Sequence, residues 1–161
     1  MSENHKTPSD YINDGNNSPV SFLFELSFGG KEASSKNYFQ EASGINQEMN
    51  IEEVGSGGEN QFKYRLPGVA KYNNLVLKRG LVSKNSALPS WVISTLNPGL
   101  VKPIETKDIK VTLLDSKQNI IISWDFINAY PIKWDVSNLN SMESEIAIET
   151  IEFAYNFFKK N

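Results

Sequence analysis

The chain has 161 residues, of which 39 % are hydrophobic, 11 % aromatic and 22 % charged, a composition typical of one folded domain. A formal net charge of -3 with a pI near 5.2 argues against stable binding of nucleic acid, which requires a concentrated basic surface. There is no cysteine and one histidine, His5, so disulfides, thiolate metal sites and the usual catalytic triads lack their residues. We therefore expect neither an enzyme nor a protein that carries a metal or cofactor.

Residues 1–19 differ from the rest of the chain. They are polar, and Pro8, Gly15 and Pro19 interrupt any regular element, so we expect a flexible N-terminal segment followed by one domain over residues 20–161. The segment lacks the charged-then-apolar order of a signal peptide, and no apolar run reaches the length of a membrane span.

The first elements of the domain are predicted to be strands. Apolar residues alternate with polar ones over residues 22–28, the pattern of a half-buried strand. A second extended run covers residues 39–54 and is interrupted at Gly44. One face of this run is polar and is expected to be wet and acidic; it carries Asn46, Glu48, Asn50 and Glu52.

The middle of the chain is predicted to add a strand, a short helix and a hairpin. The strand covers residues 75–82, and the helix covers Leu88 to Leu96 with Trp91 on its buried side. Alternation on both sides of turn residues 115–119 predicts a hairpin over residues 108–127.

Two later features concern the end of the domain. The Tyr130-Pro131 step is expected to redirect the chain into residues 132–136. The closing segment EIAIETIEFAYNFF is ambiguous, because Asn140 and Glu143 fit a helix capping box while the isoleucines and aromatics that follow also fit a strand.

Candidate catalytic groups give no convergent pattern. Carboxylates occur near one another, as in Glu52-Glu53 or in Asp115 and Asp125, but nothing in the sequence fixes the separation that acid–base chemistry needs. The glycine-rich loop GSGGEN lacks the Gly-Lys-Ser/Thr ending of a phosphate-binding loop and does not match GxGxxG. We expect solvated charges and a loop at these positions, and a solvated side chain at His5.

The cluster Lys78-Arg79-Gly80 lies at the end of an apolar strand. Arg79 has the same parity as Leu75 and Leu77, so it belongs to the face that those leucines bury. Two interpretations remain open: the strand ends in solvent, or Arg79 pairs with a carboxylate of another subunit. In the second case, reversal of the Arg79 charge should leave the monomer folded and weaken assembly.

Three longer stretches carry a more specific pattern. They are FLFELSFGG with YFQEASGINQEMNIEEV, then GGENQFKYRLPGVAKYNNLVLKRGLV, and then FINAYPIKWDVSNLNSMESEIAIETIEFAY. Together they run from Phe22 to Tyr155, and they resemble the tail-tube proteins of contractile phages and of phage-tail-like contractile injection systems. The residues that match the family pattern and are candidates for subunit interfaces are Gly58, Asn60, Leu66, Pro67, Gly68, Lys78, Arg79, Gly80, Tyr130, Pro131 and Trp134.

The resemblance implies a mainly β fold with one short helix, built as two packed antiparallel sheets or a β-barrel. It implies that six subunits form a ring, that strands from all six close a larger barrel around a lumen, and that rings stack into a tube. It also favours a strand over residues 145–157, a loop followed by a strand over residues 66–80, and a helix outside the barrel, packed through Trp91.

The resemblance also implies the partners and the location. These are copies of the same chain, a contractile sheath, baseplate or spike and tape-measure proteins, and a cargo effector or DNA in the lumen. The protein would be made in the bacterial cytoplasm and assembled into a phage-tail-like particle that is cytoplasmic, membrane-anchored or released from the cell. The polar face with Asn46, Glu48, Asn50 and Glu52 is the candidate for the lumen wall; the sheath or the next ring is the alternative.

Two other functions also fit a β-rich chain without catalytic motifs. One is a monomeric ligand-binding β-barrel of the lipocalin kind, which would account for the alternation and the aromatic residues. The other is an enzyme that uses carboxylates and tyrosines such as Tyr64 or Tyr130. The sequence leaves open whether the tube would belong to a phage or to an injection device.

Overall fold

A computed structural model describes residues 22–29, 36–55, 57–58, 61–80, 87–97, 101–139 and 147–161. The predicted N-terminal segment, residues 1–19, lies outside the described residues. The elements in chain order are β1 (Leu23–Phe28), β2 (Asn37–Phe39), β3 (Glu41–Ser43), β4 (Gln47–Val54), β5 (Tyr64–Tyr72), β6 (Leu75–Gly80), α1 (Ala87–Leu96), β7 (Lys107–Leu114), β8 (Ile120–Val136), β9 (Ile148–Ala154) and β10 (Phe157–Lys160). The predicted mainly β class with one short helix is confirmed.

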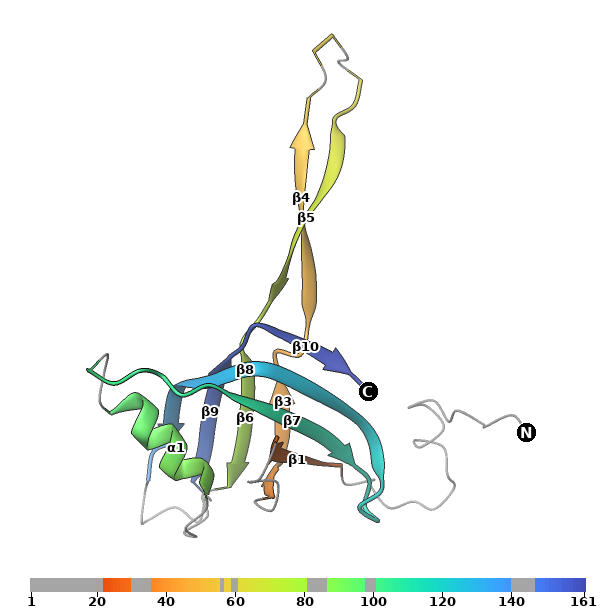
Figure 1. Cartoon of the computed structure of the whole chain (residues 1–161). Helices are drawn as coiled ribbons and strands as arrows, with labels where there is room; N and C mark the ends of the chain where they lie inside the picture. Colours follow the sequence, from red (N-terminus) through yellow and green to blue (C-terminus); the bar gives the residue numbers. More distant parts are fainter. Residues whose placement is uncertain are drawn as a thin grey trace.

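The larger sheet folds back on itself into a flattened barrel. Its antiparallel strands follow the order β2-β1-β7-β8-β9-β6-β3, and the two end strands of this order are consecutive in the chain. Only Gln40 separates β2 from β3, and its N–H donates to the carbonyl of Lys78 at 2.9 Å. The kinked segment from β2 to β3 therefore joins the two edges of the sheet, because its first half pairs with β1 and its second half with β6 (Figure 1).

The barrel interior is filled by apolar side chains from nearly every strand. The strands place alternate residues inward, and the fully buried large side chains are Leu26, Phe39, Leu75, Leu77, Ile109, Val111, Phe126, Ile151 and Phe153. A barrel whose interior is packed in this way differs from a lipocalin, whose interior holds its ligand.

Helix α1 packs against the barrel through Trp91, as predicted. Leu88, Trp91 and Val92 are buried. The Trp91 ring stacks on Phe153 of β9 at 5.8 Å and meets Phe28 of β1 edge-on at 5.5 Å. Since β1 and β9 belong to opposite halves of the barrel, this one side chain ties both halves to the helix.

Strand β8 is continuous through the Tyr130-Pro131 step, so the predicted redirection of the chain there is wrong. What changes at this step is the partner of the strand. Residues before it pair with β7, and from Tyr130 onward they pair with β9 on the other edge. Proline is tolerated because no described strand pairs with β8 opposite β9 over this part.

The closing segment is extended, as the resemblance implied, but it divides at residues 155–156 into the two strands β9 and β10. Both β9 and β10 pair with the same edge of β8, Tyr130 with Ala154 and Ile127 with Phe157. The alternative capping box at Asn140 and Glu143 lies outside the described residues.

Candidate functional site

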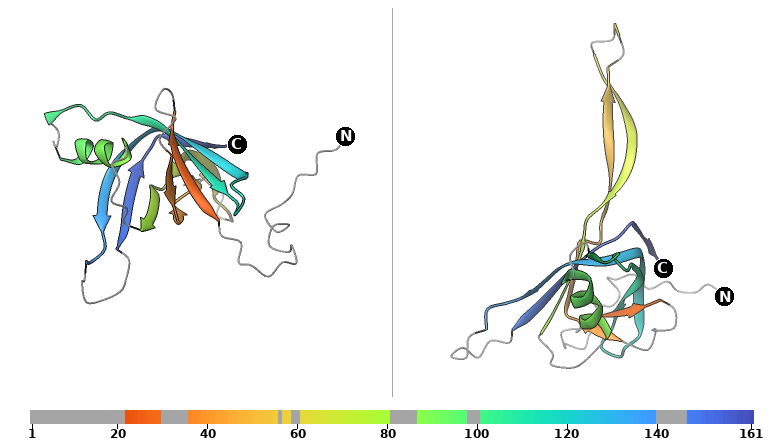
Figure 2. Two further views of the ribbon diagram at one scale, coloured as in Figure 1. Left: turned by 90° about the horizontal axis from the view of Figure 1, so that it is seen from below. Right: turned by 60° about the vertical axis from the view of Figure 1, so that its left-hand side comes forward.

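Strands β4 and β5 form a separate two-stranded ribbon that projects from the barrel, here called the arm (Figures 1 and 2). Every residue of β4 is exposed, as are most residues of β5. Gly57 and Gly58 lie in the turn at its tip, while Asn60, a family-motif candidate, lies outside the described residues.

The structure corrects the expected loop after Leu66. Residues 66–72 belong to β5 and pair with β4. The misleading signals were Pro67 and Gly68, which usually interrupt strands. Between Met49 and Ile51 the register shifts, because β5 has one residue more than β4 at this bulge. A Cβ on Gly68 would lie 3.0 Å from the carbonyl oxygen of Asn50, so this close approach favours glycine.

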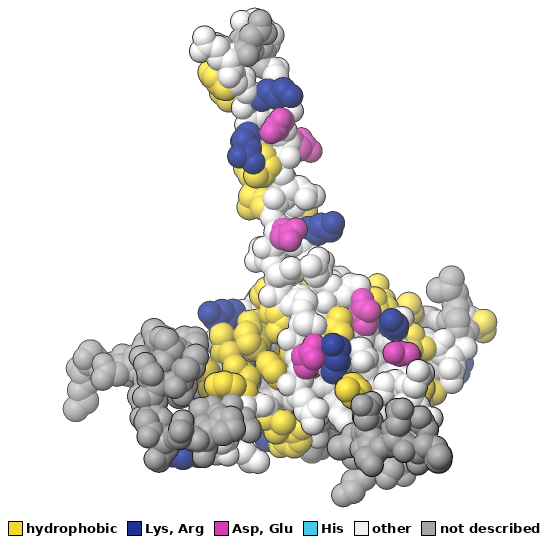
Figure 3. All heavy atoms as spheres, turned by 180° about the vertical axis from the view of Figure 1, so that it is seen from behind, with side chains coloured by type: hydrophobic (Ala, Val, Ile, Leu, Met, Phe, Trp, Pro, Cys, Tyr) yellow, Lys and Arg dark blue, Asp and Glu magenta, His cyan; other side chains and the backbone are white. Residues whose placement is uncertain are grey.

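The two faces of the arm differ in chemistry. Residues directly opposite one another share a face, so Met49 and Ala70 lie with Ile51 and Pro67 on one face. Met49 is 59 % exposed and Ile51 is 50 % exposed. We call Met49, Ile51, Pro67 and Ala70 the apolar stripe. Figure 3 shows apolar and charged side chains interleaved along the arm, and further apolar side chains on the barrel below it.

The opposite face carries three of the four lumen-facing candidates: Glu48, Asn50 and Glu52 share one parity of β4. Lys71 lies across from Glu48 and Leu66 lies across from Glu52, so this face is less acidic than the strand alone suggested. Asn46 does not belong to it, because it precedes β4 and its side-chain oxygen is buried without a hydrogen-bond partner. We call Glu48, Asn50 and Glu52 the acidic face.

Two of the family motifs meet at one buried carboxylate inside the barrel. Arg79 Nε donates to Glu149 Oε2 at 2.5 Å, and the indole Nε1 of Trp134 donates to Glu149 Oε1 at 2.8 Å. The Arg79 guanidinium also lies 5.0 Å from the centre of the Phe39 ring. Side-chain exposure is 10 % for Arg79 and 5 % for Glu149, so this ion pair is shielded from water.

The need of Arg79 for a partner is confirmed, but neither interpretation drawn from the sequence describes it. The strand does not end in solvent at this residue, and the carboxylate comes from Glu149 of the same chain. The ion pair therefore needs no second subunit. Register explains the contact, since Arg79 and Glu149 lie directly opposite one another on β6 and β9.

The other motif residues lie in different surroundings. Lys78, next to Arg79, points outward and pairs with Glu41 at 2.8 Å. Pro131 is fully buried, whereas Trp134 is 44 % exposed. The motif residues thus divide between the arm and the strands β6 and β8 of the barrel, and they do not converge on one pocket.

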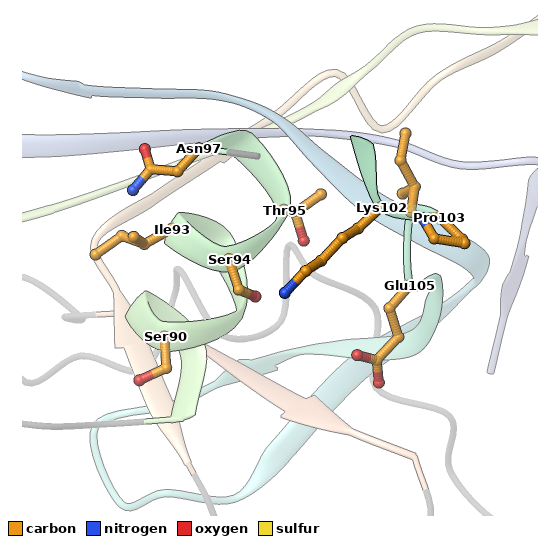
Figure 4. A pocket seen from close by; sticks show the side chains of 9 residues that line it. Ser90, Ile93, Ser94, Thr95, Asn97, Lys102, Pro103 and Glu105 are labelled. Atoms are coloured by element: carbon orange, nitrogen blue, oxygen red, sulfur yellow. The ribbon is translucent and has the colours of Figure 1, made fainter. Parts of the chain in front are cut away.

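A hollow of about 540 Å³ lies between α1 and the chain that leads into β7 (Figure 4). The hydroxyls of Ser94 and Thr95 both donate to the carbonyl of Trp91, and Lys102 extends toward the helix. Its lining residues are Ser90, Ile93, Ser94, Thr95, Asn97, Lys102, Pro103, Ile104 and Glu105. The hydroxyls of Ser94 and Thr95 are thus engaged by the backbone of the helix.

The carboxylates considered as catalytic candidates have structural contacts. Asp115 caps the β7–β8 turn through the N–H groups of Lys117 and Asn119, and hydrogen bonds from Asn119 lower the pKa of Asp115. Asp125 pairs with Lys110 at 3.5 Å. In the described part of the chain, no group of three or more His, Cys, Asp or Glu side chains could hold a metal ion.

No helix among the described residues is long and apolar enough to span a membrane.

Several solved structures share this architecture. A chain of the extracellular contractile injection system PVC, from its sheath–tube complex in the extended state, has a TM-score of 0.69 at 22 % identity over 97 % of this chain and 99 % of that chain. A chain of the anti-feeding prophage baseplate has a TM-score of 0.68 at 20 % identity over 89 % and 94 %. A type six secretion system protein has a TM-score of 0.54 at 10 % identity over 86 % and 82 %. Each match covers most of both chains, so the protein shares the fold of these chains.

The amino-acid sequence of the chain matches a known protein family. The model of the T4-like virus tail tube protein gp19 family matches residues 20–159, and the chain belongs to this family. Comparison with curated protein sequences gives no match. The resemblance read from the three sequence stretches is confirmed, and the protein is a structural subunit of a tail tube.

Proposed function

We propose that this chain forms the inner tube of a contractile injection system or contractile phage tail, as stacked six-membered rings inside a sheath. Its function is to form a hollow conduit for a cargo effector or DNA, without catalysis. The observation that carries the proposal is the arm, which leaves the barrel and is exposed over the whole of β4.

An isolated two-stranded ribbon is at best marginally stable in water. The arm nevertheless exposes both of its faces, both outer edges and the apolar stripe. Unpaired edges and contiguous exposed apolar residues are typical of surfaces that another chain covers. A neighbouring copy is the simplest partner, because a tail tube is built from repeated copies of one subunit.

The structural neighbours support the proposed partners. In the anti-feeding prophage, a chain of this fold belongs to a baseplate whose structure has sixfold symmetry. In PVC, a chain of this fold lies in a complex of sheath and tube. By analogy, we propose a homo-hexamer, a surrounding sheath, and contacts with a baseplate or spike and with a tape-measure protein in a particle assembled by a bacterium.

The acidic face is proposed to line the lumen. Glu48 and Glu52 would repeat six times in every ring, and Lys71 would offset part of that charge. Like charge on the wall and on a nucleic acid disfavours retention of the cargo. We expect Glu48→Lys with Glu52→Lys to permit assembly and to make the tubes bind DNA in a salt-dependent way. If the variant tubes bind no more DNA than wild-type tubes, the acidic face does not line the lumen.

The apolar stripe gives the direct test of assembly. Met49→Asp with Ile51→Asp is expected to abolish rings and tubes in electron micrographs while the thermal unfolding of the monomer stays unchanged. Ile120→Asp is the matched control, because Ile120 is 70 % exposed but lies in the β7–β8 hairpin. Tubes formed normally by the stripe variant, or a wild-type chain that stays monomeric under all conditions, would contradict the proposal.

A further inference from the structure

Four aromatic rings meet where the arm joins the barrel. Tyr72, at the base of the arm, lies 5.6 Å from Phe158 and 6.0 Å from Tyr155, centre to centre. Behind them, Phe126 lies 4.8 Å from Tyr155 and 5.7 Å from Phe158. We call Phe126, Tyr155 and Phe158 the aromatic socket, and Tyr72 is the arm residue that it holds.

The socket is built from the C-terminal part of the barrel. Phe126 is a fully buried residue of β8, Tyr155 follows β9, and Phe158 lies on β10. Strand β10 pairs with β8 through Phe158 and Phe126, so the last strand of the chain carries one wall of the socket. Figure 1 shows β10 passing beside the base of the arm.

The strands are interrupted in both connections between the barrel and the arm, at the base of the arm. Residues 44–46 separate β3 from β4, and residues 73–74 separate β5 from β6. On the barrel side the connection is fixed, since Asn74 Nδ2 donates to Glu152 Oε1 at 2.8 Å. On the arm side, β4 and β5 pair with each other and with no other described strand. The two interruptions form a hinge line, and Tyr72 lies directly beyond it.

We propose that the aromatic socket sets the angle of the arm relative to the barrel, so that the C-terminal strand β10 positions the arm for assembly. Edge-to-face packing of the kind seen between Tyr72 and Phe158 has a preferred geometry. A ring held in that geometry resists rotation about the hinge line. An arm held at one angle loses less conformational freedom when a neighbouring copy binds it, and this second role rests on the proposed function.

Adjacent residues of β10 provide a matched pair of variants. Phe158 belongs to the socket, whereas Phe157 is 37 % exposed and lies near Lys159. Because the chain contains no cysteine, spin labels can be attached through Val69→Cys on the arm and Ile120→Cys on the barrel. Both positions are exposed, at 83 % and 70 %.

Distances between the two labels are then measured by pulsed electron paramagnetic resonance in chains too dilute to assemble. We expect one narrow distribution for the labelled wild type and for Phe157→Ala, and a distribution at least twice as wide for Phe158→Ala. A narrow distribution in Phe158→Ala, or a wide one in the wild type, would overturn the proposal. Tyr72→Ala tests the same contact from the arm and leaves the barrel core intact.

Assembly of the same variants is measured separately, by light scattering at high concentration. Slower tube formation by Phe158→Ala and Tyr72→Ala than by Phe157→Ala is the expected result, and equal rates would remove the role in assembly. A wild-type chain that forms no tubes would defeat the proposed function, whereas the label distances would still decide whether the socket fixes the arm.

Discussion

The barrel and the arm are both built from antiparallel strands, yet they place their side chains in opposite environments. In β6 of the barrel, buried residues alternate with partly exposed ones. In β4 of the arm, every residue is exposed. The barrel closes on itself through the step at Gln40, so its main edges are paired within the chain. The arm has no such closure, and its outer edges are open to another chain.

Because the barrel is buried and the arm is exposed, substitutions in the two regions should affect different properties of the protein. A substitution in the barrel changes apolar packing or a buried ion pair, so it should change the free energy of unfolding of the monomer. A substitution on the exposed arm touches little within the chain, so it should change association and leave unfolding nearly constant.

Loss of the Arg79 cation should have the largest effect, and Arg79→Ala is the mildest change that removes it. It leaves the Glu149 carboxylate buried without its cation, which costs about 3–5 kcal/mol. The neighbouring pair Lys78–Glu41 is 40 % and 53 % exposed, so the control Lys78→Ala should cost less than about 1 kcal/mol. Urea denaturation of both variants measures the difference in their free energies of unfolding. Equal losses would show that the buried ion pair contributes no more to stability than the exposed one.

The ion pair between Arg79 and Glu149 also changes the effect that we expect from reversing the charge at Arg79. In Arg79→Glu, two carboxylates would face each other inside the barrel, so we expect loss of the fold. The earlier expectation of a folded monomer with weakened assembly assumed a partner on another subunit. A folded, monomeric Arg79→Glu would restore that assumption.

Gly44→Ala should come next. Gly44 has φ +81°, and an added Cβ would meet the Asn74 carbonyl oxygen at 1.9 Å, so backbone must shift at the hinge line. We expect a loss of about 2–3 kcal/mol. Gly55→Ala is the control, because a Cβ there meets nothing within 4 Å. Thermal unfolding that is equally perturbed by both changes would contradict this account.

Removal of the arm should have a smaller effect on unfolding. Gln47 and Tyr72 lie opposite one another, so residues 48–71 can be replaced by Asn-Gly, the sequence favoured in a two-residue hairpin turn. The barrel should keep its free energy of unfolding to within about 1 kcal/mol, since the part removed packs on itself. Rings and tubes should be absent from electron micrographs. Unfolding of the shortened chain would show that the barrel depends on the arm.

Tyr155→Phe should have the smallest effect. The Tyr155 hydroxyl is buried without a hydrogen-bond partner among the described residues, so its removal should change the free energy of unfolding by less than about 0.5 kcal/mol at neutral pH. Burial, with a smaller contribution from Tyr72, raises the pKa of Tyr155 to about 12 from 10.0.

The raised pKa makes this prediction depend on pH. Between pH 10 and 12 the folded state keeps the Tyr155 proton, whereas the unfolded state loses it. The free energy of unfolding is therefore at its full value below pH 10 with respect to this group, and it falls as the pH rises toward 12. Tyr155→Phe should flatten this part of a stability–pH curve. An unchanged slope would mean that Tyr155 ionises in the folded state as it does in the unfolded state.

The sequence predicted the barrel well because its strands are buried on one face. Ile109 and Val111 alternate with polar residues, and the turn at Asp115 separates them from a second alternating run. Periodicity in a sequence reports one-sided burial of this kind. The same reasoning located Arg79 on the buried face, but not Glu149 as its partner. Alternation shows which residues of one strand share a face. It does not show which strand, or which residue of that strand, lies opposite them in the folded sheet.

The arm could not be predicted from periodicity. Leu66 to Tyr72 have no alternation to detect, because neither face is buried within the chain and the bulge at Gly68 shifts the parity. The Pro67-Gly68 pair is typical of a turn. Alternation predicts the polar face of β4, but Lys71 and Leu66 lie across from it on β5, where the sequence predicts a loop. A segment whose partner is another molecule leaves a weak signal in its own sequence.

The single-residue step at Gln40 has a consequence for how such a chain can evolve. Phe39 points inward before the step and Ala42 packs against the core after it, while Glu41 is exposed. One inserted residue would slip β3 against β6 and exchange its inner and outer sides. The tip of the arm has no such constraint, since its length sets no barrel register. We expect related chains to vary in arm length and to preserve the spacing from Phe39 to Ala42.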